Sequence, residues 1–155
     1  MSIQIGQQAP EFSLFNTDKK EIKLSELKGQ NVLLLFIPFA FTGVCTDELC
    51  NVRDNINVYS SANAVVLGIS VDTPFSLKRF KEDQNYNFDL LSDFNKEAIK
   101  AYDCMYESFA MGMRGVAKRS AFVIDKEGVV RYAEVLEDAG KVPDFDAIQA
   151  CLKSL

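Results

Sequence analysis

The chain has 155 residues, of which 48% are hydrophobic and 25% charged, and its formal net charge at pH 7 is −5. This length is enough to bury a core without disulfides or a metal, so we expect a single domain over residues 1–155. The scattered acidic charge argues against a nucleic-acid or anionic-membrane partner, and the sequence shows neither a membrane-spanning run nor a secretion signal, which predicts a cytoplasmic protein.

The first third of the chain predicts a hairpin, a helical turn and a buried strand. Residues 12–15 and 21–24 alternate apolar and polar side chains on either side of a polar turn, which is typical of a hairpin. Residues 25–29 have the pattern of one helical turn closed by glycine. Residues 32–36 are a continuous apolar run, as expected for a strand that is covered on both faces.

Helices and strands should alternate in the middle of the chain. Residues 42–60 have a helical period, and the side chains expected on the inward face are Cys45, Leu49, Val52, Ile56 and Tyr59. The next buried strand is expected at residues 64–71, and Pro74 opens another helix.

The last elements predict the fold class. They are a short strand at residues 90–91, a short helix at 96–102, a partly ordered loop at 106–118, a hairpin of 120–124 and 129–135, and a final helix that begins at Asp144. Strands alternating with helices, followed by a hairpin and a closing helix, predict an α/β fold with a mixed central sheet and helices on both faces. The thioredoxin-like arrangement has this order of elements, although periodicity alone does not separate it from other α/β folds.

The chain has four cysteines, at positions 45, 50, 104 and 151, and no histidine. The absence of histidine excludes Cys–His and Ser–His catalytic pairs and most zinc sites, and we expect no metal or cofactor. In a reducing compartment, scattered cysteines are more often buried or reactive thiols than a disulfide framework. A catalytic cysteine here must therefore be activated by other means.

Cys45 is the cysteine in the most informative position, because it lies at the turn between a buried strand and a long helix. The helix dipole and the unpaired N–H groups of a first turn favour a thiolate there. Asp47 and Glu48 oppose that charge, so a cation is needed, and Arg119 is the candidate because it directly precedes a predicted core strand. From position alone, Cys45 would more often be a small buried hydrophobe and Arg119 a solvated surface charge.

Two distant segments together resemble the peroxiredoxin family. Pro38, Thr42 and Cys45 match the family hallmark Pro-x3-Thr/Ser-x2-Cys, and Glu48 stands where the family commonly has Glu. Arg119 opens a segment similar to the family's Arg-x-x-Phe-Val-Ile-Asp strand. The other similar segments are residues 9–12, 68–72, 90–93 and 128–131, so the resemblance covers nearly the whole chain.

The resemblance implies a thioredoxin-like fold and a thiol-dependent peroxidase that reduces hydrogen peroxide, organic hydroperoxides or both. Cys45 would be the nucleophile that becomes a sulfenic acid, Thr42 would hold the peroxide, and Arg119 would stabilise the sulfur and oxygens. Pro38 would shield the sulfur from water, and Glu48 would orient Arg119. A thioredoxin- or glutaredoxin-like protein is the implied reductant.

The way in which the sulfenic acid is resolved depends on the type of peroxiredoxin. The sequence around Cys45 is similar to the alkyl hydroperoxide reductase E type, whereas the Cys-x4-Cys spacing is similar to the bacterioferritin-comigratory type. The second likeness implies that Cys50 forms a disulfide with Cys45, and the alternative is a one-cysteine enzyme with an external thiol. Cys104 and Cys151 are interpreted as inert thiols.

Two other functions and one assembly remain open from the sequence. A thiol–disulfide oxidoreductase of the same fold would need Cys-x-x-Cys at the turn, where Asp47 and Glu48 stand instead. A non-catalytic binding module would leave the set of Thr42, Cys45 and Arg119 without purpose. Several large apolar residues near the active-site turn also predict a homodimer; they are Phe39, Phe41, Phe109, Met111 and Met113.

Overall fold

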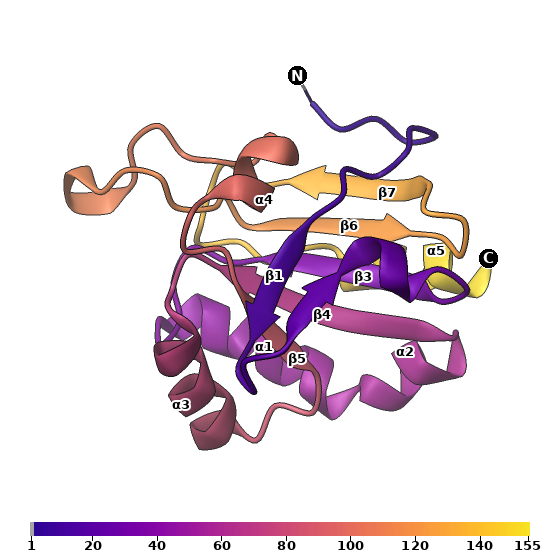
Figure 1. Ribbon diagram of the computed structural model, residues 1–155, viewed down its shortest axis with the longest axis horizontal. Coiled ribbons are helices and arrows are strands. Elements are labelled where there is room, and N and C mark those ends of the chain that lie inside the picture. Colours follow the sequence, from indigo (N-terminus) through magenta and orange to yellow (C-terminus); the bar gives the residue numbers. More distant parts are fainter. Residues whose placement is uncertain (1) are drawn as a thin grey trace.

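The computed structural model describes residues 2–155, which build one seven-stranded sheet with the order β2-β1-β5-β4-β3-β6-β7 (Figure 1). The strands are β1 (Ser13–Asn16), β2 (Glu21–Lys23), β3 (Asn31–Phe36), β4 (Ala64–Ser70), β5 (Asp89–Ser92), β6 (Ser120–Ile124) and β7 (Val130–Val135). The three central strands β3, β4 and β5 are parallel, and the other neighbours pair antiparallel. The mixed central sheet and the N-terminal hairpin are therefore confirmed.

Helices cover both faces of the sheet, as the sequence predicts. They are α1 (Gly43–Asp54), α2 (Ile56–Ser61), α3 (Pro74–Gln84), α4 (Glu97–Ala101) and α5 (Phe145–Lys153), with 3-10 turns η1 (Leu24–Leu27) and η2 (Ala110–Gly112). One core cluster joins the sheet to α1, α2, α3 and α5, and the other joins it to α4, η1 and the N-terminal segment. Among residues 2–155, no helix has both the length and the apolar character needed to cross a bilayer.

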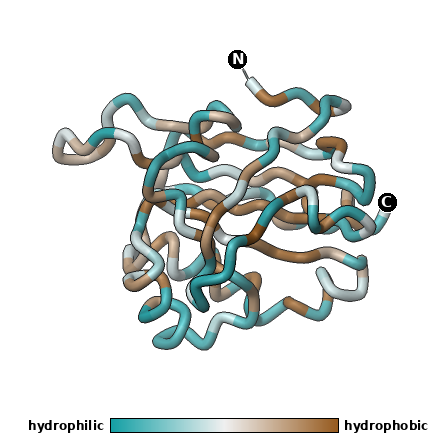
Figure 2. The backbone as a smooth tube through the Cα atoms, in the orientation of Figure 1, coloured by the Kyte–Doolittle hydropathy of each residue, from teal (hydrophilic) through white to brown (hydrophobic). Residues whose placement is uncertain are grey.

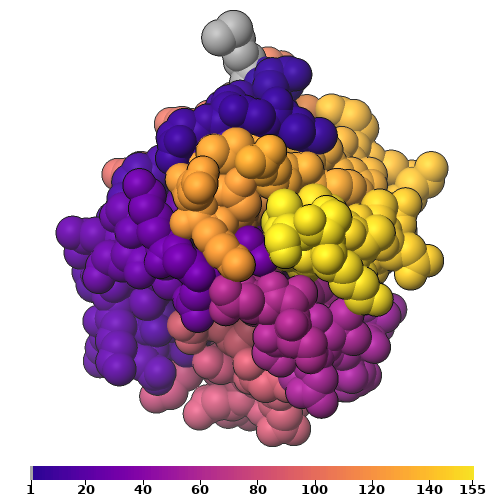
Figure 3. Space-filling view, turned by 90° about the vertical axis from the view of Figure 1, so that its right-hand side faces the viewer, coloured from indigo at the N-terminus to yellow at the C-terminus, as the bar shows by residue number. Residues whose placement is uncertain are grey.

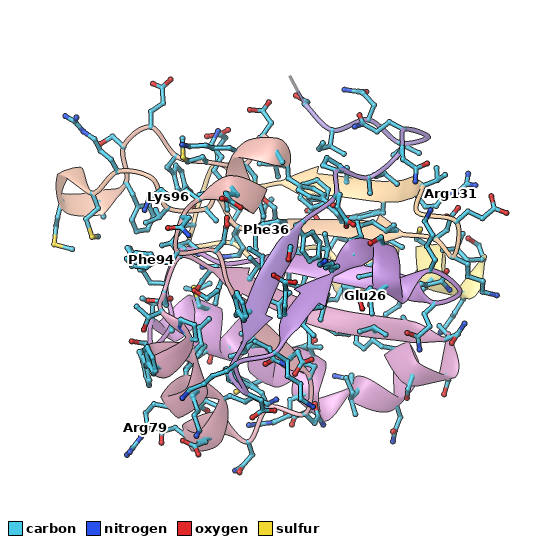
Figure 4. The ribbon with its side chains drawn as sticks, viewed as in Figure 1. Glu26, Phe36, Arg79, Phe94, Lys96 and Arg131 are labelled. Carbon is cyan, nitrogen blue, oxygen red and sulfur yellow. The ribbon has the colours of Figure 1, made fainter. Side chains whose placement is uncertain are left out.

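Strand β3 shows why a continuous apolar run is needed in the middle of this sheet. Leu33 and Leu35 point into the cluster beneath α1, whereas Val32, Leu34 and Phe36 point into the cluster beneath α4. All five side chains are at most 1% exposed. The central strands are accordingly the most hydrophobic part of the trace, and Phe36 lies inside the molecule while charged side chains project from its margin (Figures 2 and 4).

The helix expected at residues 42–60 is divided at Asn55 into α1 and α2. Asn55 leaves the helical conformation, with ψ at 21°, and its side-chain amide donates to the carbonyl of Asn51 over 2.8 Å. Such local side-chain bonds compete with the regular backbone ladder. The predicted inward face survives the break, because Leu49, Val52 and Tyr59 remain fully buried.

The sheet register brings the two informative segments of the sequence together. Strand β6 runs antiparallel to β3, with Phe36 opposite Ser120. The start of β6 therefore lies beside the end of β3, where the chain turns into α1. Figure 3 views the other end of the molecule, where the C-terminal helix lies beside the turn that joins β6 to β7.

Candidate active site

Cys45 lies in the first turn of α1, directly after the turn from β3. Thr42 is the N-cap residue, and the first helical hydrogen bond runs from Thr46 N–H to the Thr42 carbonyl over 2.9 Å. The N–H groups of residues 43–45 precede that bond and have no partner within the helix. Cys45 itself is 0% exposed and belongs to the core cluster beneath α1. Its sulfur is therefore at the positive end of the helix, in a desolvated position.

Arg119 reaches this sulfur from its position directly before β6. Its Nη1 lies 3.2 Å from Cys45 Sγ and 2.7 Å from Glu48 Oε1, where it donates to both. On its other edge, Nη2 and Nε donate to the Ala139 carbonyl over 2.9 and 3.3 Å. Arg119 is only 2% exposed, so a planar guanidinium is fixed in one orientation by three groups.

Glu48 is an unusual carboxyl because it is fully buried with only one of its oxygens bonded. Its Oε2 has no hydrogen-bond partner among the described residues. Burial raises the pKa of Glu48 from 4.5 to about 7 even though Arg119 acts in the opposite direction. Because the folded-state pKa is raised, the contribution of Glu48 to stability is complete below pH 4.5 and is lost as the pH rises through about 7.

Thr42 and Pro38 lie in the segment that leads into α1. The Thr42 hydroxyl is exposed and donates to the Phe39 carbonyl over 3.1 Å, so its oxygen remains free to accept a hydrogen bond. It makes no side-chain cap bond to the helix. Pro38 is buried two residues after the end of β3 and contributes no N–H group. A ligand at this turn would meet donors from Arg119 and the helix, and an acceptor from Thr42.

Cys50 is on the same helix but in different surroundings. It is half-buried, and its Sγ lies 3.5 Å from Gln84 Oε1 and 3.9 Å from the Tyr86 hydroxyl. The Tyr86 hydroxyl also donates to the Thr46 carbonyl over 3.3 Å, within the first turns of α1. Thus the structure brings Cys45, Glu48 and Arg119 together, whereas the Cys50 sulfur makes its contacts with Gln84 and Tyr86.

The other two cysteines have the character of unreactive thiols. Cys104 is 0% exposed, and burial raises its pKa to about 12. Burial also raises the pKa of Cys151, which lies on α5 with its Sγ 3.7 Å from the Arg131 carbonyl. Neither thiol is near a cation in the way that Cys45 is near Arg119. Residues 2–155 contain no group of three or more cysteines and carboxylates placed to hold a metal ion.

The Ala139 carbonyl is a group at this site that the sequence did not indicate. It is a backbone atom in the loop after β7, and any residue type would provide it. The sequence could indicate such a group only indirectly, because the N–H donors of a buried arginine need hydrogen-bond acceptors. Lys118 and Tyr106 fasten this loop through Glu137, at 2.7 Å each.

Comparisons with known proteins identify the sequence family. The profile of the AhpC/TSA family matches residues 5–133. The chain is 37% identical over 153 residues to peroxiredoxin Bcp of Escherichia coli K12, covering 97% of this chain and 96% of the relative. It is 34% identical over 145 residues to alkyl hydroperoxide reductase E of Mycobacterium tuberculosis, covering 92% and 91% of the two chains.

Solved structures agree with these relatives. The fold is similar to that of peroxidoxin BcpB from Mycobacterium tuberculosis, with a TM-score of 0.87, 27% identity, and 99% and 98% of the two chains covered. It is also similar to a peroxiredoxin-like protein from Aquifex aeolicus, with a TM-score of 0.88, 27% identity, and 99% and 88% covered.

Proposed function

The chain belongs to the AhpC/TSA family and is a thiol-dependent peroxidase, and we propose that Cys45 is the cysteine that attacks the peroxide. The observation that carries this proposal is the 3.2 Å contact between Arg119 Nη1 and Cys45 Sγ at the first turn of α1. A guanidinium and a helix N-terminus both stabilise a thiolate, which is the nucleophilic form of cysteine. The other three thiols lack this combination.

The reaction follows from that geometry. The Cys45 thiolate attacks one oxygen of a hydroperoxide, an S–O bond forms, and the O–O bond breaks. The sulfur is oxidised to a sulfenic acid, and the leaving alkoxide or hydroxide takes a proton to become an alcohol or water. Negative charge moves from sulfur to oxygen along this line, so donors fixed by Arg119 and the helix N-terminus stabilise the transition state more than the ground state.

Three further residues have supporting roles in this proposal. Thr42 accepts a hydrogen bond from the peroxide, since its own proton is already donated to Phe39. Glu48 orients Arg119 through the 2.7 Å ion pair, in an interior where neither group can move to water. Pro38 shields the sulfur from water on the side of β3.

The competing activity of the same fold is disulfide exchange, which the comparisons do not favour. Residues 45–48 read Cys-Thr-Asp-Glu, so the Cys-x-x-Cys pair that such proteins use is missing. Peroxide consumption in the presence of a thiol reductant tests the proposal directly. Rapid turnover that requires both peroxide and thiol is expected, whereas reduction of a model disulfide without peroxide use would favour the oxidoreductase.

We propose Cys50 as the thiol that resolves the sulfenic acid, with a cytoplasmic thioredoxin- or glutaredoxin-like protein as the reductant. Residues five apart on a regular helix have Cα atoms about 8.7 Å apart, whereas a disulfide needs less than about 7 Å. The first turns of α1 must therefore unwind, and the bond from the Tyr86 hydroxyl to Thr46 must break. Helix ends are the places where such local opening costs least.

Peptide mass mapping after one equivalent of peroxide, without added thiol, tests this resolution step. We expect a Cys45–Cys50 linkage together with a loss of far-UV helical signal. The Cys151→Ser variant, which changes another half-buried cysteine, should form the same linkage. A stable sulfenic acid on Cys45 that is unaffected by Cys50→Ser would identify a one-cysteine enzyme instead.

We propose that the protein forms a homodimer through the apolar surface near the active-site turn. Of the five side chains expected there, Phe41 and Met111 are 54% and 91% exposed. Phe39 and Phe109 are half-buried and contact each other with ring centroids 6.2 Å apart. The 3-10 turn η2, which contains Met111, is part of a segment that projects from the body of the molecule (Figure 1). Exposed apolar groups of this kind usually mark an association surface.

Sedimentation at micromolar concentration measures the assembly. A dimer is expected for the unmodified chain, and Met111→Lys should shift it toward monomer while its far-UV circular dichroism stays that of the folded chain. A monomer at that concentration contradicts the proposal.

A further inference from the structure

The turn that presents Thr42 is held in a conformation that its own sequence disfavours. Phe41, directly before Thr42, has φ at +67°, in the left-handed region that a bulky side chain rarely adopts. Such a conformation persists only where surrounding contacts impose it. Two contacts hold the chain here: the Phe41 ring packs against Phe80 of α3 with ring centroids 5.0 Å apart, and one residue earlier the Ala40 N–H donates to Asp72 Oδ2 over 2.8 Å.

Asp72 is itself fixed to the central sheet by two buried serines. The Ser70 hydroxyl donates to the same Oδ2 over 2.7 Å, and the Ser92 hydroxyl donates to the Asp72 carbonyl over 2.6 Å. Ser70 and Ser92 face each other in the register of β4 and β5 and are at most 8% exposed. Buried hydroxyls at a strand end need such partners. The carboxylate is therefore a rigid link from the sheet to the turn before α1.

We propose that Asp72 is a positioning residue for the peroxide step, because it holds Ala40 and thereby fixes where the Thr42 hydroxyl lies. Without the carboxylate, the Ala40 N–H is unpaired and Phe41 relaxes toward an ordinary conformation, which displaces Thr42. Displacements of about 1 Å in a reacting group can reduce rates by about 10²-fold. This inference rests on the proposed function, because it assigns to Thr42 the role of holding the peroxide at Cys45.

A double-mutant cycle between Asp72 and Thr42 tests the inference. Asp72→Ala should slow sulfenic acid formation on Cys45 by about tenfold or more, a loss on the scale of a misplaced reacting group. In a Thr42→Val background, the same change should alter the rate by less than about twofold, because coupled residues do not act additively. Asp72→Asn retains an oxygen acceptor for Ala40 and should recover most of the loss.

A second reagent separates positioning of the peroxide from a general disturbance of Cys45. Alkylation of Cys45 by iodoacetamide does not use the Thr42 hydroxyl, so Asp72→Ala should leave that rate nearly unchanged. The inference would be overturned if Asp72→Ala slowed the reaction with peroxide equally in the unmodified and Thr42→Val backgrounds. It would also be overturned if Asp72→Ala slowed alkylation as much as it slows oxidation. If Asp72→Ala does not fold, Ser70→Ala removes one support of the carboxylate and permits the same cycle, with a smaller loss expected.

The matched control is Asp83→Ala, which changes an exposed aspartate of α3 that pairs with Arg79. It should leave both rates unchanged. Failure of the inference is distinguishable from failure of the proposed function. In the first case the unmodified chain still turns over peroxide through Cys45 and only the coupling to Thr42 is missing, whereas in the second Cys45 is not oxidised at all.

Discussion

Cys45→Ser is expected to reduce peroxide turnover by at least about 10³-fold, the scale on which enzymes lose activity when a nucleophile is removed. A serine hydroxyl stays protonated at neutral pH and is a far weaker nucleophile than a thiolate. The fold should survive, because an oxygen fits the space of the sulfur and can still accept the bond from Arg119. Peroxide consumption with excess dithiothreitol measures the loss, and thermal unfolding checks the fold.

The matched control for this substitution is Cys151→Ser, which changes a half-buried thiol on α5 that lies outside the site. It should retain full activity. Substantial turnover by the Cys45→Ser protein would mean that another thiol attacks the peroxide, and the assignment of Cys45 would then be wrong.

Local sequence patterns were sufficient to predict most of the fold. The apolar run of β3 indicated burial on both faces, and both of its faces are in fact covered. Pro74 marked the start of α3, where it is the first helical residue and Thr73 caps the helix by accepting from Ser76 N–H. These signals work because each depends on a few neighbouring residues.

The meeting of Cys45 and Arg119 depended on more than local pattern. They are 74 positions apart, and only the antiparallel register of β3 and β6 brings them together. The sequence indicated this through two family-like segments in the right order. It did not indicate that the second oxygen of Glu48 would be buried without a partner among the described residues, because that depends on how segments distant in the sequence pack around α1.

Some features could not have been predicted, for identifiable physical reasons. The left-handed Phe41 contradicts the preference of its residue type, so its conformation depends on contacts with Asp72, which follows β4, and with Phe80 of α3. The Ala139 carbonyl carries no residue-specific signal. The break at Asn55 leaves the helical spacing of apolar residues intact, so that spacing could not predict the break.

Arg119→Ala should slow oxidation of Cys45 by about 10²- to 10³-fold, the usual effect of removing one fixed donor from a developing negative charge. The slowing should persist at a pH where the thiolate is fully formed. The reason is that Arg119 Nη1 donates a hydrogen bond to the Cys45 sulfur. In the proposed reaction it also stabilises the negative charge that moves from the sulfur to the peroxide oxygens. Rates of sulfenic acid formation measured against pH separate the two contributions.

The substitution also leaves Glu48 buried without its counter-charge, and breaking a buried pair in this way can cost about 3–5 kcal/mol. The cost should be smaller here, because burial already raises the pKa of Glu48 to about 7 and a proton can neutralise it. Combining Arg119→Ala with Glu48→Gln removes both charges and keeps the experiment informative if the single variant is unstable. The double variant should still form the sulfenic acid at least about 10²-fold more slowly than the unmodified chain, because the donor is still missing. Full recovery of the rate at high pH in either variant would show that Arg119 acts only by stabilising the thiolate, and its proposed role in the transition state would be wrong.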